Sequence, residues 1–221
     1  MRVVGVIPAA GSAKRLQPLP CSKEVYPVGG RPVMDYLVER MRAASCSELR
    51  VVTRPDKLDV VAHAHELGAL VVEAEPASLA ESIALGLPGL DDADVVLVGL
   101  PDTIWEPIDG FVSLLEHLHE GASAVLGVFE SDEPERSDVV VLDRSGLVRS
   151  IHVKEARPPG RLVWGCAAAR VGAFAGLERH REPGRHFAAL AAAGRLRAVR
   201  FPGTMVDIGT PAALAALEGR A

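Results

Sequence analysis

Small residues and two cations follow the first apolar run of the chain, residues 2–7. The segment reads Pro8-Ala9-Ala10-Gly11-Ser12-Ala13-Lys14-Arg15. Small side chains let backbone N–H groups approach a polyphosphate closely, and the guanidinium of Arg15 can neutralise part of its charge. The segment has neither the Gly-Lys-Ser/Thr of a P-loop nor the Gly-x-Gly-x-x-Gly of a dinucleotide site. We therefore expect a phosphate-binding loop of another kind.

One of the few lysines of the chain comes soon afterwards. Lys23 lies in Cys21-Ser22-Lys23-Glu24-Val25-Tyr26-Pro27-Val28, and the chain contains 4 lysines against 20 arginines. A lysine in so arginine-rich a chain indicates a site that needs a compact point charge rather than a planar fork. The alternative interpretation is a solvated lysine on a loop.

Two aspartates follow apolar runs in the middle and near the end of the chain. Asp102 comes after residues 94–98, and Asp207 begins Asp207-Ile208-Gly209-Thr210-Pro211. Ligands of parallel α/β sheets bind outside the carboxyl ends of the strands, which makes Asp102, after the strand expected at residues 94–98, a candidate for a site. Both segments also have a structural interpretation. Asp102 could cap a helix or turn, and Thr210-Pro211, in the segment that Asp207 begins, could start a last helix.

Four short motifs occur in order along the chain: Ala-Ala-Gly-x-Ala-x-Arg-Leu-x-Pro, Ser-Lys-Glu, Tyr-Pro-Val-Gly-Gly-Arg-Pro and Asp-Ile-Gly-Thr-Pro. Together they resemble the signature of the sugar-1-phosphate nucleotidylyltransferases, which include glucose-1-phosphate thymidylyltransferase and UTP–glucose-1-phosphate uridylyltransferase. The resemblance implies that residues 9–14 bind the nucleotide, that Gly11 and Arg15 hold its phosphates, and that Lys23 reaches the α-phosphate. Ala13 replaces the family's second glycine. Because alanine resists positive φ, we expect either a loop that runs differently or a subgroup of the family.

The resemblance also implies a metal site and a nucleobase site. Asp102 and Asp207 correspond to the family's Mg²⁺ ligands. Two carboxylates, with phosphate oxygens and water, form the oxygen shell that Mg²⁺ prefers. The nucleobase is expected near Glu75 and Ser78, where the residue types depart from the family pattern and leave the choice of base open.

The acceptor site is implied by two further segments. Lys154 lies in Val153-Lys154-Glu155, where the family reads Glu-Lys-Pro, and corresponds to the lysine near the sugar phosphate. Trp164 and Gly165 correspond to the strand that lines the sugar pocket, although Trp164 also suits the core or its rim. The changed residues around Lys154 allow either a displaced sugar contact or a different substrate.

Short β-branched runs alternate with stretches of helical period, which predicts an α/β protein. Strands are expected at residues 2–7, 49–53, 70–72, 94–98, 124–129, 139–142, 147–153, 162–168 and 196–201. Helices are expected at residues 33–41, from a cap at Asp56 through Leu67, at 79–87, 171–179 and 184–193, and from Pro211 onward. This order predicts a Rossmann-like, mixed and mostly parallel sheet with helices on both faces. A turn at residues 143–146 predicts a small antiparallel lid portion.

Composition limits the class of protein. The chain has 221 residues, a net charge of −5 and no basic cluster, which argues against a nucleic-acid partner. No apolar run is long enough to span a membrane and no signal segment precedes residues 2–7, so no membrane association and a cytoplasmic location are expected. We expect one catalytic domain over residues 1–221, with the nucleotide-diphospho-sugar transferase fold that the resemblance implies. Whether it pairs into a homo-oligomer stays open.

The resemblance implies a specific reaction. An NTP and a sugar 1-phosphate, the expected small-molecule substrates, would give an NDP-sugar and pyrophosphate by in-line displacement with Mg²⁺ as cofactor. The transferred group could be thymidylyl, uridylyl or cytidylyl. One alternative is a cytidylyltransferase that acts on a non-sugar phosphate or phosphonate. Another is a non-catalytic regulatory subunit that binds a nucleotide or sugar phosphate.

Overall fold

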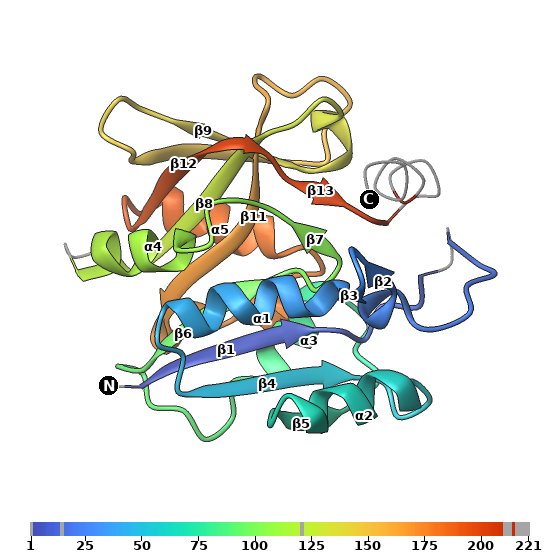
Figure 1. Cartoon of the computed structure of the whole chain (residues 1–221). Coiled ribbons are helices and arrows are strands. Elements are labelled where there is room, and N and C mark those ends of the chain that lie inside the picture. Colours follow the sequence, from blue (N-terminus) through green and yellow to red (C-terminus); the bar gives the residue numbers. More distant parts are fainter. Residues whose placement is uncertain (1, 14–15, 120–121, 210–213, 215–221) are drawn as a thin grey trace.

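The computed structural model describes residues 2–13, 16–119, 122–209 and 214, and a twisted nine-stranded sheet runs through it (Figure 1). Four parallel strands form one half of this sheet, in the order β6 (Val95–Gly99), β1 (Val3–Pro8), β4 (Glu48–Thr53) and β5 (Leu70–Glu73). β1 and β6 are buried along most of their length, which explains why their sequences are continuously apolar rather than alternating.

The second half of the sheet is mixed. β11 (Leu162–Arg170) runs antiparallel to β6 and to β8 (Ala124–Glu130), while β12 (Leu196–Thr204) runs parallel to β8. β9 (Asp138–Leu142) and β10 (Val148–Val153) form an antiparallel hairpin at the top of Figure 1. The predicted mixed sheet and its antiparallel portion are therefore confirmed.

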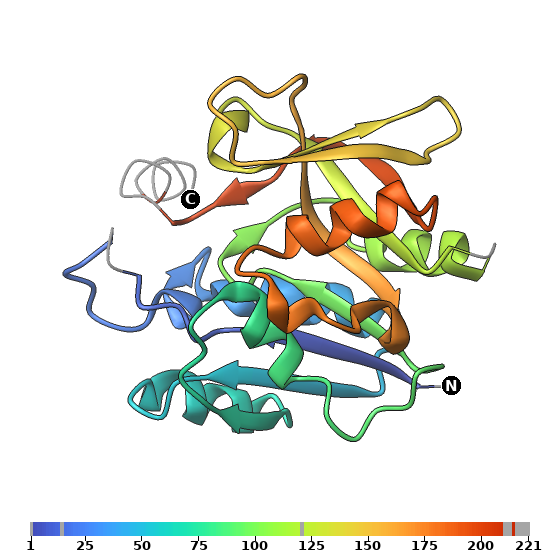
Figure 2. The ribbon, with the colours of Figure 1, turned by 180° about the vertical axis from the view of Figure 1, so that it is seen from behind.

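Helices cover both faces of the sheet, as the alternating pattern predicted. One face packs against α1 (Val33–Ala43), α2 (Leu58–Glu66) and α4 (Gly110–His119). The other face packs against α3 (Leu79–Leu85) and α5 (Pro183–Ala192), which lie nearer the viewer in Figure 2. Successive strand residues alternate between the two clusters, since side chains of a strand point to opposite faces.

Short elements position loops at the carboxyl ends of the parallel strands. A 3-10 turn, η1 (Lys23–Val25), precedes a small hairpin of β2 (Pro27–Val28) and β3 (Arg31–Pro32). β7 (Thr103–Ile104) pairs antiparallel with β13 (Val206–Asp207). This second pair brings residues 206–207 to the segment that follows β6.

Three sequence predictions need correction or fall outside the description. Asp56 does not cap α2, because Lys57 occupies the N-cap position and Asp56 pairs with Arg54 instead. Residues 171–179 form two 3-10 turns rather than one helix, because the chain turns left-handed at Gly176 (φ 86°). The structure also has a 3-10 turn, η2 (Pro134–Arg136), before the β9–β10 hairpin. The cap at Thr210 and the helix from Pro211 lie outside the described residues.

Candidate active site

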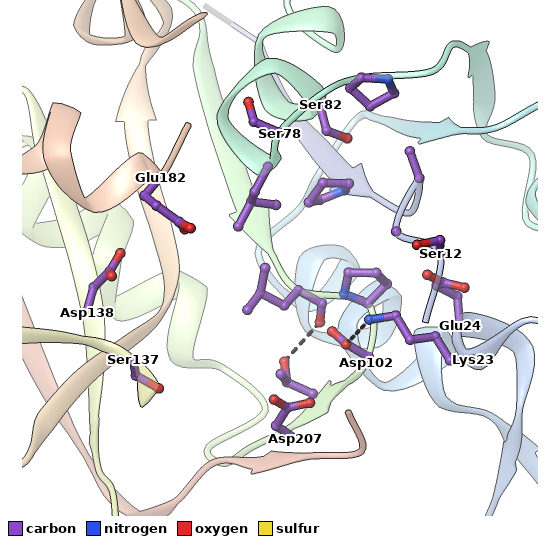
Figure 3. A pocket seen from close by; sticks show the side chains of 18 of the residues that line it. Ser12, Lys23, Glu24, Ser78, Ser82, Asp102, Ser137, Asp138, Glu182 and Asp207 are labelled. Carbon is purple, nitrogen blue, oxygen red and sulfur yellow. Dashed lines mark hydrogen bonds and ion pairs between the residues drawn. The ribbon is translucent and has the colours of Figure 1, made fainter. Parts of the chain in front are cut away.

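A cavity of about 510 Å³ opens where the parallel strands end. Its wall includes Pro8 at the end of β1 and Leu100–Asp102 after β6. Asp138, at the start of β9, lies on the opposite wall (Figure 3). Lys154, directly after β10, also lines the cavity. This position agrees with the expectation that ligands of such sheets bind outside the carboxyl ends of strands.

The loop after β1 forms one wall of the cavity. Ala9 is buried, and its N–H donates to the Val52 oxygen (2.7 Å), which extends the pairing of β1 with β4. Ala10, Gly11 and Ser12 line the cavity. Ala13 adopts φ 48°, so the loop keeps a left-handed residue at this position although alanine disfavours it. The expected phosphate contacts at Lys14 and Arg15 lie outside the described residues.

Lys23 lines the same cavity from η1. Its side chain is 18% exposed, and its ammonium contacts the carboxylate of Asp102 (Figure 3). Burial lowers the pKa of Lys23, but Asp102, Glu24 and Asp207 outweigh this effect and raise the pKa above its ordinary value. Lys23 is therefore a paired cation inside the cavity and not the solvated loop lysine of the alternative interpretation.

Asp102 and Asp207 come together through backbone pairing. Asp207 lies opposite Thr103 in the β7–β13 pair, and the N–H of Ile208 donates to the Asp102 carbonyl oxygen (3.0 Å). Both aspartates line the cavity, and both influence the pKa of Lys23. Oδ1 of Asp207 accepts a hydrogen bond from the N–H of Gly209 (2.6 Å).

The donor set at this point suits a hard divalent cation. Mg²⁺ is commonly held by one or two carboxylates plus substrate phosphates and water, and Asp102 and Asp207 both line the cavity here. Nowhere in the described ranges do three or more His, Cys, Asp or Glu side chains gather as metal ligands. A metal held by Asp102 and Asp207 would thus take its remaining ligands from groups such as water and substrate oxygens.

The acceptor side of the cavity carries charges of both signs. Nζ of Lys154 pairs with Oε1 of Glu182 (2.6 Å), and Nε1 of Trp164 donates to Oδ2 of Asp138 (3.1 Å). Lys154 and Trp164 line the cavity as predicted positions, whereas Gly165 is buried against Met205 and Phe129. Gly165 is therefore not among the residues that line this cavity, and its contact with a substrate stays a prediction.

Asp138 and Glu182 are cavity residues that the sequence patterns did not indicate. Asp138 is 6% exposed, and its Oδ1 accepts no hydrogen bond from the described part of the chain. Burial raises the pKa of the Asp138 carboxyl, and the Trp164 hydrogen bond only partly opposes this. The position of Asp138 at the start of an apolar strand was the one sequence feature that could have drawn attention to it, and this feature does not indicate a pocket.

The predicted nucleobase side is formed by the start of α3. Oγ of Ser78, the N-cap residue, accepts from the N–H of Glu81 (3.1 Å). Oε2 of Glu81 accepts from the N–H of Ala77 (2.7 Å), the residue before the N-cap. Ser78 lines the cavity. Glu75 is exposed and is not among the residues that line the cavity. Its Oε1 lies 3.8 Å from Nη2 of Arg54, which does line the cavity.

Comparison with known proteins identifies the family. The model of the MobA-like NTP transferase domain matches residues 5–200, which covers nearly the whole chain. The chain belongs to this family of nucleotidyltransferase domains.

Individual relatives are more distant. The low-salt glycan biosynthesis nucleotidyltransferase Agl11 of Haloferax volcanii is 26% identical over 168 residues, 72% of this chain and 46% of that protein. The bifunctional protein GlmU of Azorhizobium caulinodans is 31% identical over 169 residues, 74% of this chain and 37% of that protein. The chain therefore spans less than half the length of these relatives.

The fold also matches a solved structure. A crystal structure of a protein assigned as a glucose-1-phosphate thymidylyltransferase from Bacillus anthracis, in complex with sucrose, has a TM-score of 0.87 and 21% identity. The superposition covers 99% of this chain and 95% of the other. This likeness confirms the predicted fold class. Within the described residues, none of the helices has both the length and the apolar character needed to cross a membrane.

Proposed function

We propose that this protein transfers a nucleotidyl group from an NTP to a sugar 1-phosphate, releasing pyrophosphate and forming an NDP-sugar. The observation that carries this proposal is that Lys23, Asp102 and Asp207 line one cavity together with residues 10–12. Residues 10–12 belong to the expected phosphate-binding loop after β1, which we call the phosphate loop. Membership of the NTP transferase family and the names of the relatives support it. The name of the protein with the similar fold, a thymidylyltransferase, together with the expected transfer of a thymidylyl, uridylyl or cytidylyl group, makes dTTP, UTP and CTP the first candidates.

The reaction requires positioning and charge neutralisation rather than a covalent intermediate. An oxygen of the sugar phosphate attacks the α-phosphorus, a new P–O bond forms, and the bond to the β-phosphate breaks with the electron pair leaving on pyrophosphate. Lys23 holds the α-phosphoryl group through its compact positive charge. N–H groups of residues 10–12 hold the remaining phosphates, with Arg15 beside them as the family resemblance implies.

Asp102 and Asp207 are the residues that would hold Mg²⁺, which when bound supplies positive charge to the phosphate oxygens. Lys154 orients the attacking phosphate from the opposite wall, where Glu182 holds its ammonium. Trp164 closes the wall behind the acceptor, with its indole N–H bonded to Asp138.

The test is pyrophosphate release by the purified protein with Mg²⁺. dTTP, UTP, CTP, GTP and ATP are each combined with a panel of sugar 1-phosphates and a few non-sugar phosphates and phosphonates. The expected result is EDTA-sensitive release with a pyrimidine nucleotide and a sugar 1-phosphate. Release with only a non-sugar acceptor would replace the sugar assignment by the cytidylyltransferase alternative. Nucleotide binding without release for any pair would favour a regulatory subunit.

A further inference from the structure

Lys57 lies behind the phosphate loop, at the N-cap position of α2. Its Nζ donates to the backbone oxygens of Ala9 (2.7 Å) and Gly11 (3.1 Å) and to Oε2 of Glu24 (2.6 Å). A lysine ammonium has three N–H donors, and these three acceptors match them. The Lys57 side chain is only 11% exposed and that of Glu24 1% exposed, so this is an internal contact rather than a surface ion pair.

These contacts determine the direction of two peptide groups. In a trans peptide the C=O and the following N–H point in opposite directions. Because the oxygens of Ala9 and Gly11 point toward Lys57, the N–H groups of Ala10 and Ser12 point away from it. Ala10 and Ser12 line the cavity, and no residue that the structure describes accepts a hydrogen bond from either N–H. Two backbone donors are thus held toward the cavity and available to an anion.

The start of α2 also holds the turn that carries Lys23. Asp59 accepts hydrogen bonds from the N–H (2.6 Å) and the hydroxyl (2.7 Å) of Ser22, the residue before Lys23. Glu24, the residue after it, is the ion-pair partner of Lys57. Lys57 therefore holds both the phosphate loop and the Lys23 turn, and Asp59 holds the turn from the same end of α2.

We propose that Lys57 is a positioning residue for the nucleotide: its buried ammonium orients the N–H groups of Ala10 and Ser12 toward the triphosphate. The inference rests on the proposed function, because the anion in question is the triphosphate of the NTP. Lys57 does not touch the substrate itself. Its removal should weaken NTP binding while leaving the acceptor site, on the opposite wall, unaffected.

The experiment compares the wild-type chain with Lys57→Met, Lys57→Arg and Lys57→Gln. Calorimetry with dTTP, UTP and CTP in the presence of Mg²⁺ gives Kd for the nucleotide, and steady-state pyrophosphate release gives KM for the acceptor. Lys57→Met should raise the Kd of the tightest-binding nucleotide roughly tenfold or more, because oriented hydrogen bonds to a charged group are lost. KM for the acceptor should stay unchanged, and Lys57→Arg should restore part of the affinity. Arg42→Met, which removes an exposed cation from α1, is the matched control and should bind as wild type does.

The result separates positioning from general stability. Lys57→Met leaves Glu24 buried without its cation and should also lower the Tm; if it does not fold, Lys57→Gln, which keeps two donors, takes its place. An unchanged nucleotide Kd, or equal weakening of both substrates, would overturn the positioning role while leaving the proposed function intact. Failure of the wild-type protein to bind any nucleotide would instead overturn the proposed function, and this inference with it.

Discussion

Lys23 and Asp102 form an ion pair whose side chains are 18% and 12% exposed, inside a cavity where a phosphate chain is expected. Such a pair holds both side chains in place before substrate arrives. Ligands would have to break this ion pair. A phosphate bound to Lys23 would replace the Asp102 carboxylate, and a cation bound to Asp102 would replace the Lys23 ammonium.

Neutralising either residue should abolish most of the turnover. Asp102→Asn and Lys23→Ala are each expected to lower kcat by about 10²-fold or more, because each removes a preorganised charge at the reacting phosphate. Steady-state pyrophosphate release measures the effect, and circular dichroism checks that the fold is kept. Asp132→Asn, at a carboxylate that is 89% exposed, is the matched control and should retain turnover. Near-normal kcat in either site variant would contradict the assigned roles.

Asp138 should make stability depend on pH in the direction opposite to most carboxylates. Its pKa is raised by burial, so the folded protein binds this proton more tightly than the unfolded chain does. Its contribution to stability is therefore full below the ordinary pKa of 3.8 and is lost as pH rises through the raised value. Asp138→Asn keeps an acceptor for the Trp164 indole N–H. Because asparagine does not ionise, the variant does not lose this stability as pH rises.

The check is urea unfolding of wild type and Asp138→Asn from pH 4 to pH 8. The stability of the variant relative to wild type should grow as pH rises and then level off. A difference that stays flat, or that increasingly favours wild type, would show that Asp138 is not held against its ionisation by burial.

At the scale of the elements, the short β7–β13 pair determines how the two aspartates of the candidate site lie relative to each other. Four paired residues bring Asp207 beside Asp102, and the Ile208 N–H adds one hydrogen bond to the Asp102 carbonyl oxygen. Ile208 is 1% exposed, so its side chain also anchors the segment in the interior. The geometry of the two carboxylates therefore depends on a short strand that begins after the last long one ends.

Comparing Ile208→Pro with Ile208→Ala should separate the effect of the Ile208–Asp102 backbone hydrogen bond from the effect of side-chain packing. Proline removes the N–H donor as well as the isoleucine side chain, while Ile208→Ala removes only the side chain. Both variants should lose roughly 2–5 kcal/mol of stability from the lost packing. Proline alone should lower kcat further, by up to about 10²-fold, because a small displacement of Asp207 is costly to positioning. Equal kcat values for the two variants would exclude a role for the hydrogen bond.

At the scale of the whole molecule, two apolar clusters cover the two faces of one sheet. Each cluster contains residues from both halves of the chain, such as Ile7 and Phe201 on one face and Val6 and Leu190 on the other. Trp105 belongs to the first cluster, where it packs 5.4 Å from Phe111 between ring centroids. Trp164 belongs to the second and packs 5.4 Å from Phe187.

This arrangement predicts one cooperative unfolding transition. The two tryptophans report on opposite faces of the sheet, so Trp105→Phe and Trp164→Phe leave one reporter each. Urea unfolding followed by fluorescence should agree with far-UV circular dichroism of the same variant in both cases. Phe129→Ala should lower stability by roughly 3–5 kcal/mol without splitting the transition. Fluorescence and circular dichroism midpoints that differ within one variant would instead indicate two independently folding parts.

Much of the fold could be predicted because strand and helix patterns are local. The β-branched runs around Val4, Val51 and Val96 and the helical period of residues 33–41 are properties of neighbouring residues, and they match β1, β4, β6 and α1. The helix expected over residues 171–179 is wrong because Gly176 interrupts it in a left-handed conformation. Such an interruption depends on one residue whose conformation the pattern does not specify.

The sequence by itself determined the residue types of the candidate site: a small-residue loop after the first strand, Lys23, Asp102 and Asp207. Only the tertiary structure decided what these residues contact. Lys23 meets Asp102 across 79 residues of chain, and Lys57 meets Ala9 across 48. In the same way, only the packing of distant segments decides that Asp138 lines the cavity and that Gly165 is buried in the core. Local patterns reflect interactions between near neighbours, whereas these contacts depend on strand order and on which faces pack together.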